Sequence, residues 1–223
     1  MVFSPLALLT MLALVVGLVG LFFILQIGLI GYAFDKVGVP PAALFGLLLL
    51  SWLGSWVNIP LFRMTHDGPV DDLVVVRFFG QRYVVPRRRR PRESVLAVNL
   101  GGALVPCCLS LYLLLQSIAP LRTLLATAVI VLITYWYATP LRGVGIAVPL
   151  FIPPLSAAVA AMLLVPQQAP LTAYVAGTVG TLIGADLLNL GRLRELEAPV
   201  MSIGGAGTFD GVFLTGILAV LLA

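Results

Sequence analysis

The sequence predicts an all-α, polytopic membrane protein with about seven transmembrane helices. Of its 223 residues, 61% are hydrophobic and only 10% are charged, whereas a soluble domain is about half apolar and a quarter charged. Seven apolar segments stand out, each bounded by polar, glycine or proline residues. They cover residues 4–32, 42–58, 95–117, 122–138, 146–165, 170–190 and 208–223.

Composition also excludes several classes of protein. The net charge of +4 does not indicate a nucleic-acid partner, because the basic residues lie in loops beside the membrane. The single histidine, His66, has no second ligand of its kind, so we expect no metal site and no cofactor. Cys107 and Cys108 are adjacent within an apolar run, which is typical of buried, unpaired cysteines.

The first segment is predicted to be a retained transmembrane helix. Residues 1–34 carry no charge, so the basic n-region of a cleaved signal peptide is missing. Because this apolar run is longer than a ~30 Å hydrocarbon core requires, we expect it to tilt or bend.

The distribution of Lys and Arg predicts the orientation of the chain in the membrane. With 59–94 in the cytoplasm, 11 basic residues lie inside and only Lys36 and Arg122 outside, so the N-terminus is cytoplasmic.

The cytoplasmic loop 59–94 is predicted to contain a β-hairpin. Residues 73–79 and 82–86 are rich in β-branched and aromatic side chains, and Gly80-Gln81 suits a two-residue turn. The run Arg87, Arg88, Arg89 and Arg90 follows directly. It is typical of a topology anchor, and the alternative is a site for anionic lipid headgroups.

Two segments interrupt regular helix. Residues 139–154 read TPLRGVGIAVPLFIPP, and their prolines deny regular helical hydrogen bonding. We expect a kinked or re-entrant entry into the fifth helix; the alternative is an interfacial loop that ends before the lipid begins. Glycines at 203–207 make a helix unfavourable before Thr208, so this stretch is expected to dip into the membrane.

Asp186 and Asp210 are the strongest candidates for a functional site. Asp210 lies 13 residues before the C-terminus, or ~20 Å below the outer face, and Asp186 lies 16 residues after Pro170, or ~24 Å below it. Both therefore fall at similar depth in the inner half of the bilayer, where a carboxylate is costly and usually functional. The short connection between their helices favours contact.

Neighbouring residues suggest how the site is arranged. Ala173, Gly177, Gly180 and Gly184 recur at helical spacing and predict a seam for close helix packing. Asp186 lies ~200° away from Gly184 around the helix and shares its face with Asn189. Residues expected to line a cavity or contact substrate are Asn58, Asn99, Asn189, Gly205, Gly207 and Thr208. For the asparagines the alternative is hydrogen bonding between helices.

Three interpretations of the aspartates remain open. In the first, both aspartates are structural: Asp210 caps the last helix, and Asp186 forms a hydrogen bond or ion pair with Asn189, a backbone N–H or Arg192. Alternatively, the two carboxyls share a proton and perform aspartic-protease chemistry. The third interpretation is a proton- or cation-coupled transporter or channel for a small solute, built as a homo-oligomer. No internal repeat supports the third interpretation.

Two resemblances bear on these interpretations. GGAGTFDG around Asp210 is similar to the GxGD signature of intramembrane aspartyl proteases. Its Gly205-x-Gly207-x-x-Asp210 spacing is two residues longer, and no proline follows Asp210. That resemblance implies Asp186 and Asp210 as catalytic residues acting on a transmembrane peptide.

The second resemblance covers the chain from the second apolar segment onward. AYVAGTVGTLIGADLLNL, SIGGAGTFDGVFLTGILAVLLA and VNLGGALVP resemble an uncharacterised prokaryotic family of small polytopic membrane proteins. The resemblance implies a polytopic helical architecture and a location in a prokaryotic plasma membrane, with lipids as partners. It implies no particular activity. We therefore expect a membrane protein with a paired-aspartate site of intramembrane-protease type.

Overall fold

The computed structural model describes residues 5–65, 73–78, 81–86, 93–141, 145–195, 200–205 and 211–223. Within these residues the chain is mostly helical. The α-helices are α1 (Pro5–Val37), α2 (Pro41–Gly54), α3 (Val105–Leu115), α4 (Pro120–Tyr137), α5 (Ile152–Leu164), α6 (Ala169–Thr181) and α7 (Gly211–Leu222).

The seven helices do not all have the length of a membrane span. Among the described residues, Leu14–Val37, Pro120–Tyr137 and Pro166–Arg192 are long and apolar enough to cross a membrane. The other helices are apolar but shorter. The predicted helical architecture is therefore confirmed, and three of its helices have the length and composition of membrane spans.

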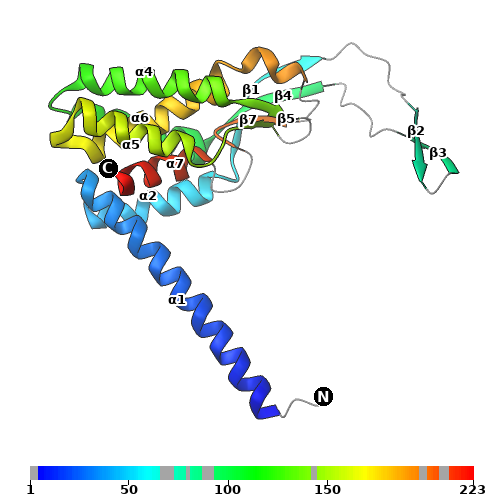
Figure 1. Cartoon of the computed structure of the whole chain (residues 1–223), viewed down its shortest axis with the longest axis horizontal. Coiled ribbons are helices and arrows are strands. Elements are labelled where there is room, and N and C mark those ends of the chain that lie inside the picture. The colour runs from blue at the N-terminus through cyan, green and yellow to red at the C-terminus, as the bar shows by residue number, and fades with distance from the viewer. Residues whose placement is uncertain are drawn as a thin grey trace.

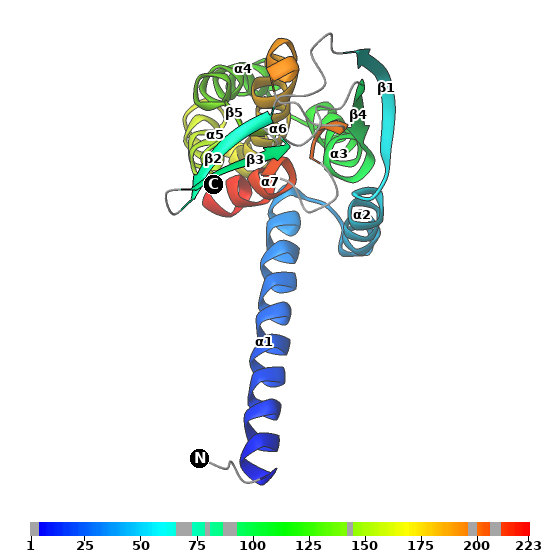
Figure 2. The ribbon, with the colours of Figure 1, turned by 90° about the vertical axis from the view of Figure 1, so that its right-hand side faces the viewer.

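Helix α6 lies at the centre of a bundle. It packs against α3, α4, α5 and α7, and nearly all of its side chains are buried. Helix α1 differs, because it contacts the bundle only near its C-terminal end and runs away from it as a single rod (Figure 1, Figure 2). The side chains at 14–21 and 24–29 are exposed.

The predicted small-residue seam on α6 is confirmed. A methyl group on Gly180 would meet Ile130 of α4, and one on Gly184 would meet Thr134 of α4. Gly177 instead approaches Ala219 of α7 and Ala157 of α5. The absence of side chains at Gly177, Gly180 and Gly184 therefore lets α4, α5 and α7 approach this backbone closely.

A three-stranded sheet closes one end of the bundle, and the sequence did not predict it. Its order is β1 (Asn58–Thr65), β4 (Glu93–Asn99) and β7 (Val200–Ile203). β1 and β4 pair antiparallel, while β4 and β7 pair parallel. We call the end of the bundle where these strands lie the sheet end (Figure 1).

Two of the predicted helices are wrong where the strands of this sheet form. The segment predicted at 42–58 ends as a helix at Gly54, and β1 begins at Asn58. The segment predicted at 95–117 starts as β4, passes through the π-helical turn η1 (Leu100–Leu104), and becomes α-helical only at Val105. The physical reason is pairing: an apolar run such as 95–99 suits a buried central strand as well as a helix.

Two further strand pairs lie outside this sheet. β2 (Leu73–Phe78) and β3 (Gln81–Pro86) pair antiparallel with Phe78 opposite Gln81, so Gln81 belongs to the strand and not to the turn. β5 (Thr139–Leu141) and β6 (Gly145–Ala147) also pair antiparallel. The expected kinked entry into the fifth helix is therefore a short hairpin, followed by irregular chain and a turn at Leu150 and Phe151 that leads to Ile152.

Candidate functional site

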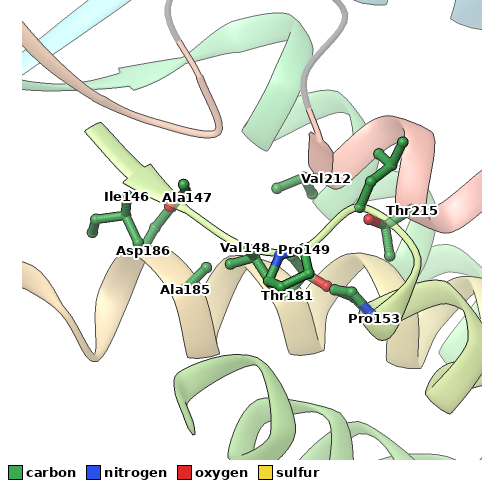
Figure 3. A pocket seen from close by; sticks show the side chains of 11 residues that line it. Ile146, Ala147, Val148, Pro149, Pro153, Thr181, Ala185, Asp186, Val212 and Thr215 are labelled. Atoms are coloured by element: carbon green, nitrogen blue, oxygen red, sulfur yellow. The ribbon is translucent and has the colours of Figure 1, made fainter. Parts of the chain in front are cut away.

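A cavity of about 220 Å³ lies between the segment before α5, the end of α6 and the start of α7. Figure 3 shows Thr181, Ala185 and Asp186 along one wall and Val212 and Thr215 along another. The chain that leads from β6 to α5 runs between them. The complete lining is Ile146, Ala147, Val148, Pro149, Leu150, Pro153, Thr181, Ala185, Asp186, Val212 and Thr215.

Interrupted secondary structure makes room for this cavity. Pro149 before α5 and Pro153 in its first turn lack backbone donors, and the chain between β6 and α5 forms neither regular helix nor strand. On the opposite wall, α6 widens into the π-helical turn η3 (Leu182–Leu187). Such turns inside α-helices occur frequently at functional sites. The Asn189 amide stabilises this turn by donating to the carbonyls of Gly184 and Ala185 at 2.9 and 3.0 Å.

Asp186 connects the cavity to the sheet. Its carboxyl is half-buried, and Oδ2 accepts a hydrogen bond of 2.8 Å from the backbone N–H of Gly204. Gly204 follows β7 with a φ of +79°, which favours glycine. A methyl group there would also collide with the Ala103 backbone. The backbone at Gly204 is thus shaped to present its N–H to the carboxylate.

Two threonines supply further polar groups in the cavity wall. Thr181 and Thr215 are both buried and lie on α6 and α7 respectively. The Thr181 hydroxyl has no hydrogen-bond partner among the described residues. An unpaired buried hydroxyl is costly and favours a bound polar ligand or water at this position.

Asn58 and Asn99 come together, but beside the cavity and not within its lining. They lie opposite each other in β1 and β4, and the Asn99 amide donates to Asn58 Oδ1 at 3.1 Å. Asn99 also donates to the Ser55 carbonyl at 2.7 Å and accepts from the Gly102 N–H at 2.7 Å. Ser202 of β7 donates to Asn58 Oδ1 at 2.5 Å. This network therefore joins all three strands of the sheet.

The remaining predicted residues have varied positions. Asn189 is fully buried, while Asp186 is half-buried at the cavity, because the π-helical turn changes the angular spacing between them. Gly205 has a φ of +88° and donates to the Ser202 carbonyl. Gly207, Thr208, Asp210 and the arginines 87–90 lie outside the described residues.

The cavity contains residues that sequence reasoning missed. Thr181 and Thr215 were not candidates, because threonine in an apolar helix is commonly satisfied by the carbonyl one turn earlier. Thr134 illustrates that ordinary case, since it donates to the Ile130 carbonyl at 2.7 Å. The spacing in the sequence could have identified these two threonines, because Thr181 lies five residues before Asp186 and Thr215 lies five residues after Asp210.

Comparison with known proteins gives a family but no activity. Residues 52–222 match the family model described as "Protein of unknown function (DUF1614)". No curated protein and no solved structure matches the chain.

Proposed function

Because the chain belongs to the DUF1614 family, whose description assigns no activity, we propose a function from the cavity itself. We propose that the protein is a membrane-embedded hydrolase of the aspartyl-protease type. Asp186 and Asp210 share one proton: one carboxylate removes a proton from water as it attacks a peptide carbonyl, and the other carboxyl protonates the departing amine. The substrate is an extended segment of a transmembrane peptide, and the enzyme lies in a prokaryotic plasma membrane.

One observation carries this proposal. Asp186 lines the cavity together with Val212 and Thr215, which belong to the first turns of α7. Asp210 precedes Val212 by two residues, so covalent geometry keeps their Cα atoms within ~7 Å of each other. The wall that holds Asp186 and the helix that follows Asp210 therefore meet at one cavity, as a carboxylate pair requires.

The size and surroundings of the cavity support a peptide substrate. About 220 Å³ is less than the ~300–1,000 Å³ of pockets for drug-sized ligands, so only a short part of a substrate enters. Ile146 and Ala147 line it from β6, an extended strand. Extended backbone beside a site is suited to bind a peptide in the same conformation.

A second candidate function rests on a different observation. The unpaired Thr181 hydroxyl, the Asp186 carboxylate and the interrupted backbone on both walls are also typical of a site that binds a cation or small solute in a coupled transporter. In that case Asp186 carries the coupling proton or cation, and cleavage is absent.

The first experiment tests whether the two aspartates approach each other. Cys107 and Cys108 are replaced by alanine, and Asp186→Cys is combined with Asp210→Cys in native membranes. Rapid disulfide formation is expected, because a bridge requires Cα atoms within about 7 Å. A folded protein that forms no bridge would exclude the protease interpretation.

The second experiment separates enzyme from transporter. The purified protein is placed in liposomes containing a pH-sensitive dye and, separately, with fluorescent transmembrane peptides. Cleavage abolished by Asp186→Asn and by Asp210→Asn supports the enzyme, and proton flux with the same sensitivity supports the transporter. Asp35→Asn is the matched control, because Asp35 is exposed on α1 and is not among the residues that line the cavity.

A further inference from the structure

Exposed aromatic side chains gather at the sheet end of the bundle. All three tryptophans of the chain lie there: Trp52 on the last turn of α2, Trp56 just before β1, and Trp136 on the last turn of α4. Their exposed fractions are 50%, 72% and 85%. Phe151, at the start of α5, is also exposed. The ends of three helices therefore present aromatic rings outward at a similar level.

The opposite end of the bundle shows the same combination on a smaller scale. Tyr32 near the end of α1, Phe45 in α2 and Tyr112 in α3 are exposed. The Lys36 ammonium lies 5.6 Å from the centre of the Tyr32 ring. At the sheet end, the Arg192 guanidinium lies 5.8 Å from the centre of the Tyr135 ring. Each end thus has a cation beside an aromatic ring, a combination found where a protein meets the two faces of a membrane.

The separation of the two ends matches a bilayer. Helix α4 contains 18 residues and connects them, so it is ~27 Å long, close to the ~30 Å of a hydrocarbon core. Between its ends, α4 exposes Leu124, Leu125 and Leu132.

We infer that the sheet end lies in the headgroup layer of a lipid bilayer, with Trp52, Trp56 and Trp136 at the boundary between headgroups and acyl chains. The edge strand β1 supports this placement, because Ile59, Leu61 and Phe62 are exposed on it. In water, an edge strand with exposed apolar side chains tends to pair with other chains and aggregate. A lipid surface covers them while headgroups and water satisfy the free backbone groups.

This placement sets the depth of the cavity. Helices α4 and α6 run side by side, with Gly180 against Ile130 and Gly184 against Thr134. The same offset of 50 residues puts Asp186 level with Trp136. The carboxylate therefore lies at the edge of the hydrocarbon and not at its centre, so water reaches the cavity from the headgroup side.

Tryptophan fluorescence tests the inference directly. The protein is reconstituted into phosphatidylcholine and phosphatidylglycerol vesicles whose acyl chains carry bromine either near the headgroup or near the chain end. A variant with Trp136 alone (Trp52→Phe, Trp56→Phe) is expected to be quenched more by shallow than by deep bromine. The matched control adds Trp136→Phe and Leu125→Trp, and its order of quenching is expected to be reversed. Leu125 lies 11 residues before Trp136, or ~16 Å, about half of the core.

Two results would overturn the inference. Stronger quenching of Trp136 by deep bromine would place the sheet end within the hydrocarbon. Absence of quenching by either lipid would show that protein or water covers these rings instead. The unsubstituted protein repeats the test without any mutation, because all three native tryptophans are assigned to the same boundary. This test does not depend on Asp210 or on any catalytic activity, so its failure is distinct from failure of the proposed function.

Discussion

Replacing Gly180 by alanine probes the closest approach of α4 and α6. The new methyl group would lie 2.7 Å from Cβ and 2.8 Å from Cγ2 of Ile130, and 3.2 Å from the Thr127 carbonyl oxygen. Carbon atoms in contact are ordinarily about 3.5–4.0 Å apart, so the overlap is ~1 Å. Ile130 is fully buried and β-branched, and it cannot rotate away. The two helices must therefore separate.

The expected cost follows from these distances. Overpacking of this kind destabilises by about 1–3 kcal/mol, and better helix propensity of alanine returns at most ~1 kcal/mol. A net loss near ~1–2 kcal/mol lowers the melting temperature of a chain of this size by roughly 2–8 °C. Thermal unfolding of the purified protein in detergent measures it. Gly28→Ala on α1 is the control, because nothing lies within 4 Å of the added methyl group.

A double-mutant cycle decides whether the overlap is the cause. Ile130→Ala alone opens a cavity and is expected to cost about 2–5 kcal/mol. In that background the Cγ2 contact at 2.8 Å is removed while the Cβ contact at 2.7 Å remains, and the new cavity lets the helix shift, so Gly180→Ala should cost less than in the parent protein. Additive costs, or a Gly180→Ala protein as stable as Gly28→Ala, would refute the reasoning.

Three other substitutions test the sheet end and the seam. Asn99→Leu removes three hydrogen bonds of a buried amide and should cost about 2–4 kcal/mol of unfolding free energy; an unchanged melting temperature would contradict the network. Gly204→Ala forces a side chain into a backbone with a φ of +79° and into Ala103, so it should lower the melting temperature more than Gly191→Ala, which has open space; equal effects would count against this geometry. Thr134→Val removes a hydroxyl whose single proton is shared between the Ile130 carbonyl at 2.7 Å and the Gly180 carbonyl at 3.1 Å. It should cost ~0.6 kcal/mol, the mean for such bonds in membranes; a loss above ~2 kcal/mol would point to a repacked seam.

Much of the helical part of the fold can be predicted from the sequence, because the length of an apolar run and the spacing of its glycines are properties of one continuous segment. The seam at Gly180 and Gly184 is an example: helical spacing alone predicts a close approach, and the structure supplies the partner, α4. The sheet was not predictable in this way. Val95 and Val200 are neighbours only through a pairing across more than 100 residues, and an apolar run gives no sign of its partner.

In the candidate site too, features of one segment could be predicted, whereas contacts between distant segments could not. Asp186 was recognisable because a charge in an apolar helix is conspicuous. Its partner, the N–H of Gly204, was not, because any backbone group is a potential donor. The π-helical turn at 182–187 was likewise invisible in the sequence, and it is the reason that Asn189 stabilises the helix end and does not face the cavity with Asp186.

The parallel pairing of β4 with β7 has a consequence for how the protein is made. During synthesis β1 and β4 emerge together and can pair early, whereas β7 emerges only after α3, α4, α5 and α6. Until then the second edge of β4 is unpaired, and contacts this distant in sequence form slowly. Gly204 follows β7, so its bond to Asp186 forms in the same late step. The cavity is therefore complete only after β7 and α7, the last elements of the chain, are in place, because α7 supplies Val212 and Thr215 to its lining.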